Sequence, residues 1–219
     1  MAKTQAPGKR ARLIQAAAEL VYRQGFGPTT IADMAGKADV PLGNVYYYFK
    51  TKEAIGAALV EEYLASHRSL RRSWESEYED PRERLSAFVV MTLENRGDLA
   101  RSGCPMGSLC TELAKSGGPL AEQASRLLVE WVDWAEQQFR GLGAGDASPG
   151  LARHLLAALQ GAAVLAHSFG TSDLVEAEAR RLIEWIAALK EASDGTGETV
   201  RQDRGRSRRR QGGTGGDLR

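Results

Sequence analysis

Cysteine and histidine are scarce in this chain, which has two cysteines and three histidines among its 219 residues. The histidines, His67, His154 and His167, belong to no Glu-x-x-His pair and to no cluster with cysteine. Zinc and di-iron sites are built from such pairs and clusters, so we expect neither a metal site nor a cofactor. We expect the two cysteines to be free thiols and not a structural bridge, because the sequence predicts a protein of a reducing compartment.

Long apolar runs and alternating apolar and polar residues are missing as well. No apolar run is long enough to span a bilayer, and Met1 is followed by a polar basic arm in place of a signal peptide, so the sequence predicts a cytosolic protein. Without alternation at a period of two, no sheet is expected. Apolar residues recur at helical spacing instead, and we predict an all-α fold.

Charge is unevenly distributed, although the whole chain is nearly neutral. Residues 1–52 contain eight Lys and Arg against three Asp and Glu, whereas residues 53–192 contain fourteen against twenty-one. Residues 193–219 have many glycines, no apolar period and six arginines between positions 201 and 210. We therefore predict a basic DNA-binding domain (1–52), a larger helical domain (53–192) and a disordered Arg-rich tail (193–219). The tail is either a solvated extension without function or a source of non-specific phosphate contacts.

Helix ends are predicted from caps, from Pro at the first helical position and from Gly after the last. Gly56, in the first turns of the fourth helix, is expected to be a flexible point. These signals and the apolar periods predict nine helices, near residues 9–24, 31–38, 41–49, 52–74, 81–98, 105–114 and 120–140, after a cap at Ser148, and after a cap at Asp173.

Residues 29–52, TTIADMAGKADVPLGNVYYYFKTK, have the pattern of two short helices joined by a tight corner. Thr30 and Asp33 have the spacing of a capping box. Asp39 tolerates the left-handed conformation that ends the first helix, and Pro41 suits the first position of the second. Val45 and Phe49, four residues apart, should face a core, so that the opposite face meets DNA; it consists of Leu42, Gly43, Asn44, Tyr46 and Tyr47.

From about Lys9 to about Leu59 the sequence resembles the helix-turn-helix signature of the TetR family of one-component transcriptional regulators. The resemblance implies a three-helix DNA-binding domain followed by a helical ligand-binding and dimerisation domain. It further implies that phosphates are anchored by Thr30 and Lys52, base edges are contacted by Leu42, Gly43 and Asn44, and the sugar-phosphate backbone is bound by Tyr46 and Tyr47. Ala32 and Leu42 depart from the family pattern, which often has polar side chains there. Asn44 would then be the one polar base reader, with thymine methyl contacts and DNA shape carrying more of the specificity.

The last two predicted helices are rich in apolar residues. Residues 151–169 are apolar on most of the helix circumference, and the following helix has an apolar face that includes Leu182. Either these helices complete a monomeric bundle, or they pair with their symmetry mates as a four-helix dimer interface. The resemblance implies the second arrangement, in which two DNA-binding domains read two half-sites of a pseudo-palindrome.

Cys104 directly precedes Pro105 and should occupy the N-cap of a helix, where the helix dipole favours a thiolate. With Arg101 close in sequence, it is a candidate sensor of oxidants or electrophiles; some TetR regulators sense reactive compounds through a cysteine in this part of the chain. The alternative is that Cys104 and Cys110 are small buried apolar residues. A disulfide between them is not expected, because six residues of helix separate their Cα atoms by about 9 Å.

A cavity for an inducer is expected among the fourth to seventh helices. Its predicted lining consists of large, adaptable side chains that could equally form ordinary core: Phe88, Met91, Cys104, Met106, Leu109, Trp131 and Trp134.

Three functions fit these features. The first is a repressor that binds a pseudo-palindromic operator as a dimer and is released by a small apolar or thiol-reactive inducer. The second is an enzyme with Cys104 as its nucleophile, for which the sequence places no activating base. The third is a constitutive architectural or adaptor protein that binds DNA or a partner without any small ligand, which a fully packed interior in the fourth to seventh helices would favour. The first is the interpretation we prefer.

Overall fold

The computed structural model describes residues 8–189, and those residues form ten α-helices and one short 3-10 turn, without a strand. The predicted tail lies outside the described residues. None of the described helices is long and apolar enough to cross a membrane. In chain order the helices are α1 (Lys9–Gln24), α2 (Ile31–Lys37), α3 (Leu42–Tyr48), α4 (Lys52–Glu77), α5 (Pro81–Glu94), α6 (Arg96–Ser102), α7 (Pro105–Ser116), α8 (Pro119–Gly141), α9 (Ser148–Phe169) and α10 (Asp173–Ala188).

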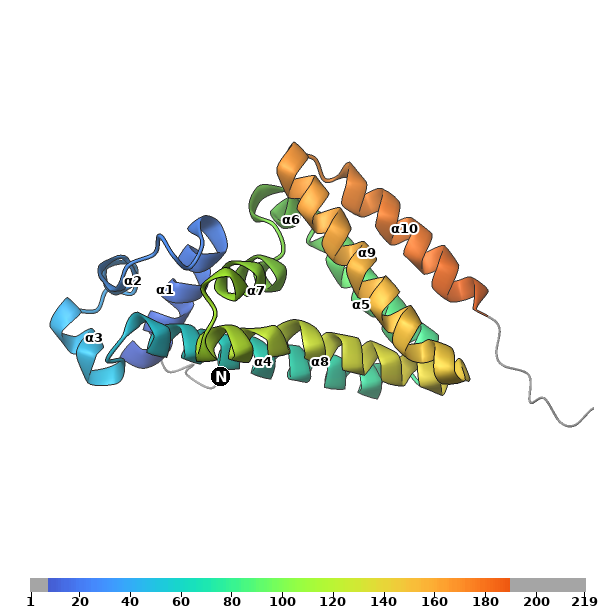
Figure 1. Cartoon of the computed structure of the whole chain (residues 1–219), viewed down its shortest axis with the longest axis horizontal. Coiled ribbons are helices and arrows are strands. Elements are labelled where there is room, and N and C mark those ends of the chain that lie inside the picture. Colours follow the sequence, from blue (N-terminus) through green and yellow to red (C-terminus); the bar gives the residue numbers. More distant parts are fainter. Residues whose placement is uncertain (1–7, 190–219) are drawn as a thin grey trace, which may run out of the picture.

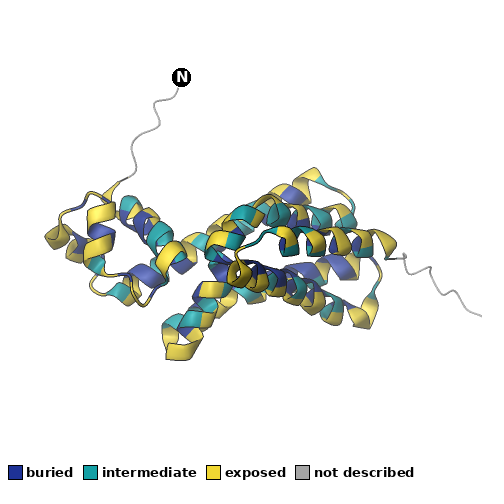
Figure 2. Ribbon diagram, turned by 90° about the horizontal axis from the view of Figure 1, so that it is seen from above, coloured by how far each residue is buried: buried dark blue, intermediate teal, exposed yellow. Residues whose placement is uncertain are grey.

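The helices form a small domain and a larger triangular one (Figure 1). Helices α1 to α3 make the small domain, and α4 leads out of it along the base of the triangle beside α8. Helices α5, α9 and α10 make the sloping side, and α7 lies between this side and the small domain. Figure 2 shows the small domain standing apart from the larger bundle, with buried residues on the inward faces of both. The all-α, two-domain prediction is therefore confirmed.

Local capping explains how the small domain begins and ends its helices. Thr30 and Asp33 form the predicted capping box: the Asp33 amide donates to Thr30 Oγ1 (3.1 Å) and the Thr30 amide donates to Asp33 Oδ2 (2.9 Å). Asp39 has a φ of 50°, the left-handed value that turns the chain toward α3. Thr51 caps α4 by accepting from the Ala54 amide (3.1 Å). These short-range bonds were all predictable from the residue spacing.

Three predicted helix ends are wrong in the larger domain. The helix expected over 81–98 breaks at Asn95, whose Nδ2 donates to the Met91 carbonyl oxygen (2.7 Å) and so competes with the helical bonding there. Ser148 does not cap α9: it already has helical dihedral angles after the 3-10 turn, and its buried Oγ has no hydrogen-bond partner within residues 8–189. Asp173 is likewise the first residue of α10, behind the N-cap Ser172.

Gly56 is a close-packing point and not the flexible point that its helix propensity predicted. A Cβ placed on it would lie 2.8 Å from Phe26 Cε2 and 2.9 Å from Leu120 Cδ2. Only a glycine therefore lets α4 approach both the small domain and the start of α8. The first turns of α4 are thus held firmly between the two domains.

Candidate DNA-binding and ligand-binding sites

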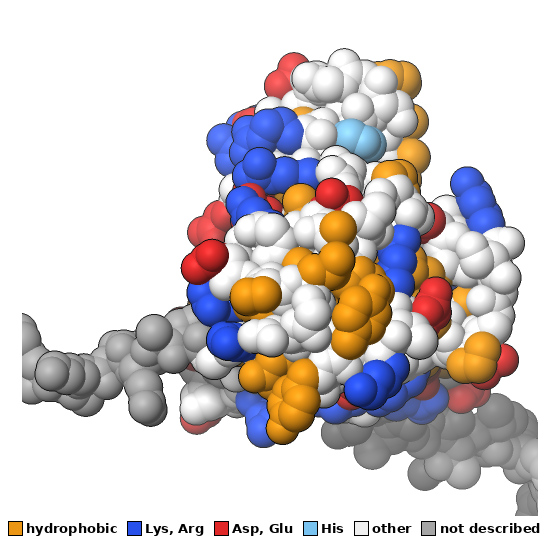
Figure 3. All heavy atoms as spheres, turned by 90° about the vertical axis from the view of Figure 1, so that its left-hand side faces the viewer, with side chains coloured by type: hydrophobic (Ala, Val, Ile, Leu, Met, Phe, Trp, Pro, Cys, Tyr) orange, Lys and Arg blue, Asp and Glu red, His pale blue; other side chains and the backbone are white. Residues whose placement is uncertain are grey.

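The outer face of α3 is the candidate DNA-binding surface. Val45 and Phe49 are buried in the core of the small domain, as predicted, and this orients the rest of the helix outward. All five residues predicted to face DNA are exposed, and the side chain at the tip, Tyr47, is 80% exposed. Figure 3 shows hydrophobic side chains gathered on this end of the molecule, with Lys and Arg side chains and some Asp and Glu side chains around them. The exposed apolar side chains suit contacts with thymine methyl groups, and the Lys and Arg side chains suit contacts with flanking phosphates.

The two predicted phosphate anchors are already engaged in hydrogen bonds within the chain. The hydroxyl and the amide of Thr30 are both used in its capping box, and these bonds lower the pKa of the Asp33 carboxyl. Lys52, at the first position of α4, donates from Nζ to the Gly27 carbonyl oxygen (2.7 Å) and lies 4.7 Å from the centre of the Phe26 ring. An ammonium group has two further protons to donate, so a phosphate contact by Lys52 stays a prediction.

A cavity of about 210 Å³ lies in the larger domain, between α4, α5, α6, α7, α8 and α9. Of the predicted lining residues, Phe88, Met91, Cys104, Met106 and Trp131 do face it. Leu109 and Trp134 do not: Leu109 is buried elsewhere in the core, and Trp134 donates from Nε1 to Glu75 Oε1 (2.9 Å) on α4. The remaining lining residues were not predicted, and they are His67, Thr92, Asn95, Leu99, Pro105, Leu159, Gln160 and Ala163.

The cavity wall carries no charged side chain. None of its lining residues is Asp, Glu, Lys or Arg. Burial, and then the nearby charge of Arg71, lowers the pKa of His67 to about 4, so this imidazole is neutral at pH 7. His67 Nδ1 and the indole nitrogen of the fully buried Trp131 have no hydrogen-bond partner among the described residues. The wall therefore suits a neutral, mainly apolar molecule that can form a hydrogen bond.

Aromatic stacking fixes one side of this cavity. The Trp131 and Phe88 rings are stacked with centroids 4.4 Å apart and planes 5° from parallel. The Arg71 guanidinium lies 5.0 Å from the Trp131 ring centre and donates to Glu130 Oε2 (3.0 Å). These contacts hold the Trp131 ring in place at the cavity wall.

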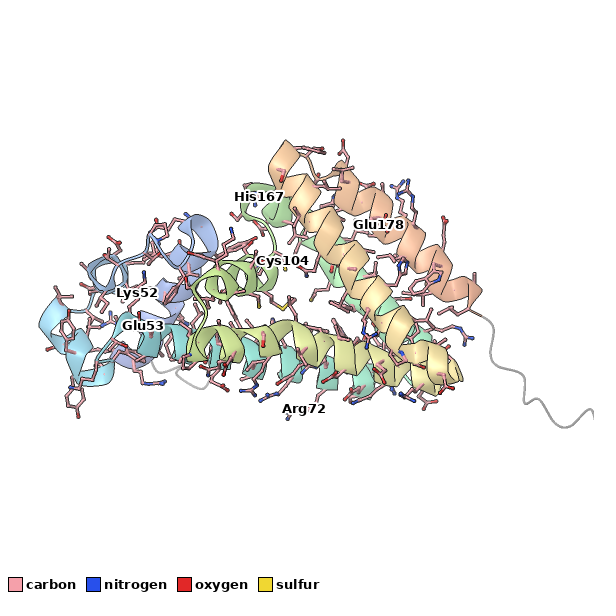
Figure 4. The ribbon with its side chains drawn as sticks, viewed as in Figure 1. Lys52, Glu53, Arg72, Cys104, His167 and Glu178 are labelled. Carbon is pink, nitrogen blue, oxygen red and sulfur yellow. The ribbon has the colours of Figure 1, made fainter. Side chains whose placement is uncertain are left out.

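Cys104 occupies the N-cap of α7, as predicted, and lies inside the triangle of helices (Figure 4). Its Sγ accepts from the Gly107 amide and from Gln160 Nε2, both at 3.4 Å. Arg101 does not contact it and pairs with Asp98 instead. Cys110 is different: its Sγ donates to the Ala124 carbonyl oxygen (3.0 Å), and burial raises its pKa to about 11. Both thiols are free, and Cys104 is the one at the cavity.

The outer face of α9 is exposed and apolar in the single chain. Val164, Leu165 and Phe169 are 62%, 46% and 68% exposed, whereas the opposite face of the helix is buried against the rest of the domain. Ala162 on α9 and Leu182 on α10 are buried inside the chain. Their burial follows from the packing of α9 on α8 and of α10 on α5, which no local pattern specifies.

The sequence comparisons agree with this geometry. The family model described as "Bacterial regulatory proteins, tetR family" matches residues 13–59. The HTH-type transcriptional repressor DhaR of Mycobacterium sp. is 28% identical over 163 residues, which cover 70% of this chain and 79% of DhaR. The HTH-type transcriptional repressor NemR of Escherichia coli is 30% identical over 114 residues, which cover 52% of this chain and 56% of NemR.

Solved structures have the same architecture. The regulatory protein TetR from Rhodobacter sphaeroides is 26% identical and superposes with a TM-score of 0.70 over 80% of this chain and 97% of that one. The reduced form of E. coli NemR, at 22% identity, has a TM-score of 0.70 over 82% of this chain and 97% of that one, and shares the fold.

Proposed function

Since the chain belongs to the TetR family of DNA-binding transcriptional regulators, we propose that it is a repressor that leaves its operator when a small inducer occupies the cavity. The observation that carries this proposal is the pairing of an exposed α3 face in one domain with an uncharged cavity in the other. DhaR and NemR, the relatives described above, are both repressors, which supports the same direction of control.

On DNA, α3 would lie in the major groove. Leu42, Gly43 and Asn44 at the start of the helix would meet base edges, while Tyr46 and Tyr47 would bind the sugar-phosphate backbone. A seven-residue helix offers too few contacts for high affinity by itself. A homodimer that reads two half-sites about 34 Å apart supplies the second set.

The exposed apolar face of α9 supports such a dimer, because apolar side chains of this size are usually covered by a partner. Gly161 adds to this support. A Cβ at Gly161 would meet nothing within 4 Å, so the centre of the face is open to a second copy. The alternative of a monomeric bundle leaves this face in water.

The inducer would be a neutral apolar molecule in the cavity, a reagent that modifies Cys104, or both. A fully packed interior would have favoured a constitutive DNA-binding protein, and the cavity of about 210 Å³ favours the ligand-responsive reading. This volume is below the 300–1,000 Å³ usual for ligand pockets, so either the inducer is small or the cavity widens on binding. The enzyme alternative is set aside, because the relatives described above are transcriptional regulators.

The test starts from DNA selected by the protein from a random duplex pool, with binding followed by fluorescence anisotropy. Iodoacetamide then serves as a thiol probe: the Cys104 thiolate attacks its CH₂ carbon, iodide leaves, and the thiol proton goes to solvent. We expect alkylation to release the wild-type protein from DNA and to leave Cys104→Ser bound. If the reagent still releases a Cys104→Ser protein from DNA, modification of Cys104 is not the signal, and the inducer is then proposed to be a neutral apolar molecule bound non-covalently in the cavity. The protein would not be a sequence-specific regulator if the selection enriched no sequence.

A further inference from the structure

The loop between α1 and α2 is bound by one carboxylate from the larger domain. Glu112, on α7, accepts from the backbone amides of Phe26 (2.8 Å, to Oε2) and Gly27 (2.5 Å, to Oε1). Gly25, with a φ of 89°, turns the chain so that both amides reach the same carboxylate. A Cβ on Gly25 would lie 3.0 Å from Glu112 Oε2, so the glycine also leaves room for it. Hydrogen bonds to an ionised acceptor are about twice as strong as neutral ones, which makes this a firm connection between the domains.

The other end of α7 is part of the cavity wall. Cys104 and Met106 face the cavity, and Gly107 packs so closely on α9 that a Cβ there would lie 2.3 Å from Gln160 Oε1. Eight residues separate Cys104 from Glu112, which in a helix is about 12 Å. One short rigid helix therefore has the cavity at its start and the DNA-binding domain near its end.

The loop that Glu112 holds leads directly into the recognition elements. Thr30, three residues after Gly27, is the N-cap of α2. On its carbonyl side, Gly27 accepts from Lys52 at the start of α4. The loop is thus hydrogen-bonded through its amides to α7 and through a carbonyl oxygen to α4. A shift of either helix would therefore also move α2 and α3.

We propose that Glu112 couples the cavity to the DNA-binding domain: a molecule or group that displaces the start of α7 moves the Glu112 carboxylate, and the two amide bonds draw the α1–α2 loop with it. This inference rests on the proposed function, since occupancy of the cavity is the signal. It assigns Glu112 as a positioning residue, because Glu112 does not line the cavity and lies on α7, outside the α3 face proposed to meet DNA.

The test fills the cavity by mutation, because the inducer is unidentified. Ala163→Phe on α9 places a ring in the cavity, and Ala163→Leu places a smaller group there if the larger one prevents folding. Each is combined with Glu112→Ala, and with Thr111→Ala as the control at an exposed position of the same helix. Circular dichroism verifies folding, and anisotropy gives the affinity for the selected DNA. We expect filling to weaken DNA binding on the order of tenfold in the wild-type and Thr111→Ala backgrounds and to have little effect with Glu112→Ala. Glu112→Gln, which keeps one acceptor oxygen, should restore part of the effect.

A second readout follows the loop itself. Hydrogen exchange of the Phe26 and Gly27 amides should accelerate in Glu112→Ala, but not in Thr111→Ala or in filled proteins that keep Glu112, because there the two amide bonds persist as the loop moves with α7. Equal loss of affinity on filling in the Glu112→Ala and wild-type backgrounds would overturn the coupling role and leave the proposed function standing. If filling leaves the affinity of the wild-type background unchanged, the cavity is not the signal, and the proposed function fails together with this inference.

Discussion

At the scale of single residues, α3 separates residues that read bases from residues that bind the backbone. Asn44 is exposed near the start of α3, and its amide can pair with adenine. Asn44→Ala should cost on the order of 1–3 kcal/mol on the selected DNA and relax discrimination at one base position per half-site. Tyr47→Phe, which removes one exposed hydroxyl, is the matched control and should weaken all duplexes alike. Competition anisotropy against single-base variants measures both. Equal losses on specific and random DNA for Asn44→Ala would mean that this face of α3 does not read bases.

His67 gives the larger domain a dependence on pH at the same scale. Its pKa is about 4 in the folded chain, against an ordinary value of 6.5, because burial and Arg71 disfavour its charged form. The unfolded chain therefore binds this proton more readily. The contribution of neutral His67 to the free energy of unfolding is fully present above pH 6.5. As the pH falls toward 4, the free energy of unfolding decreases by up to ~3 kcal/mol. Urea unfolding between pH 4.5 and 7 should show a flatter profile for His67→Gln than for the wild type. His154→Gln, on the exposed face of α9, should keep the wild-type slope.

At the scale of elements, α4 can pack closely on the small domain because Gly56 has no side chain. Gly56→Ala would force its methyl group against Phe26 and Leu120, at a cost of about 1–3 kcal/mol from overpacking, despite the better helix propensity of alanine. Gly36→Ala is the control, since a Cβ there meets nothing within 4 Å, and it should be neutral or stabilising by up to about 1 kcal/mol. Urea midpoints at constant slope report both changes. A Gly56→Ala protein that is more stable than the wild type would show that Phe26 and Leu120 move aside to make room for the added methyl group.

Elements whose ends depend on neighbouring residues were predictable, and contacts between distant elements were not. Thr30, Asp39 and Thr51 act within three or four residues of themselves, so their spacing predicted the small domain. Gly56 and Gln160 instead lie close to residues that are distant in the sequence. Gly56 leaves room for Phe26 and Leu120, and Gln160, on α9, lines the cavity. The sequence of α9 is apolar nearly all round, which could not separate the face that packs inside the chain from the face that stays exposed.

At the scale of the whole molecule, the exposed apolar face of α9 lets the proposed dimer be tested by mutation without disturbing the fold of the single chain. Val164 is 62% exposed, so Val164→Glu should leave the single chain folded but place a charge in the proposed interface. Charges at Ala162 or Leu182 would instead disrupt the interior, since both are buried. Val129→Glu on α8 is the matched control, because Val129 is 50% exposed and lies on another helix.

Sedimentation velocity at micromolar concentration, together with anisotropy on full-site and half-site DNA, decides the outcome. We expect wild type and Val129→Glu to sediment as dimers and to prefer the full site. Val164→Glu should sediment as a folded monomer whose affinity for the full site falls to that for the half-site, because one α3 reaches only one major groove. A Val164→Glu protein that remains dimeric would move the interface away from this face of α9. A wild-type protein that is monomeric at micromolar concentration would remove the two-half-site mechanism altogether.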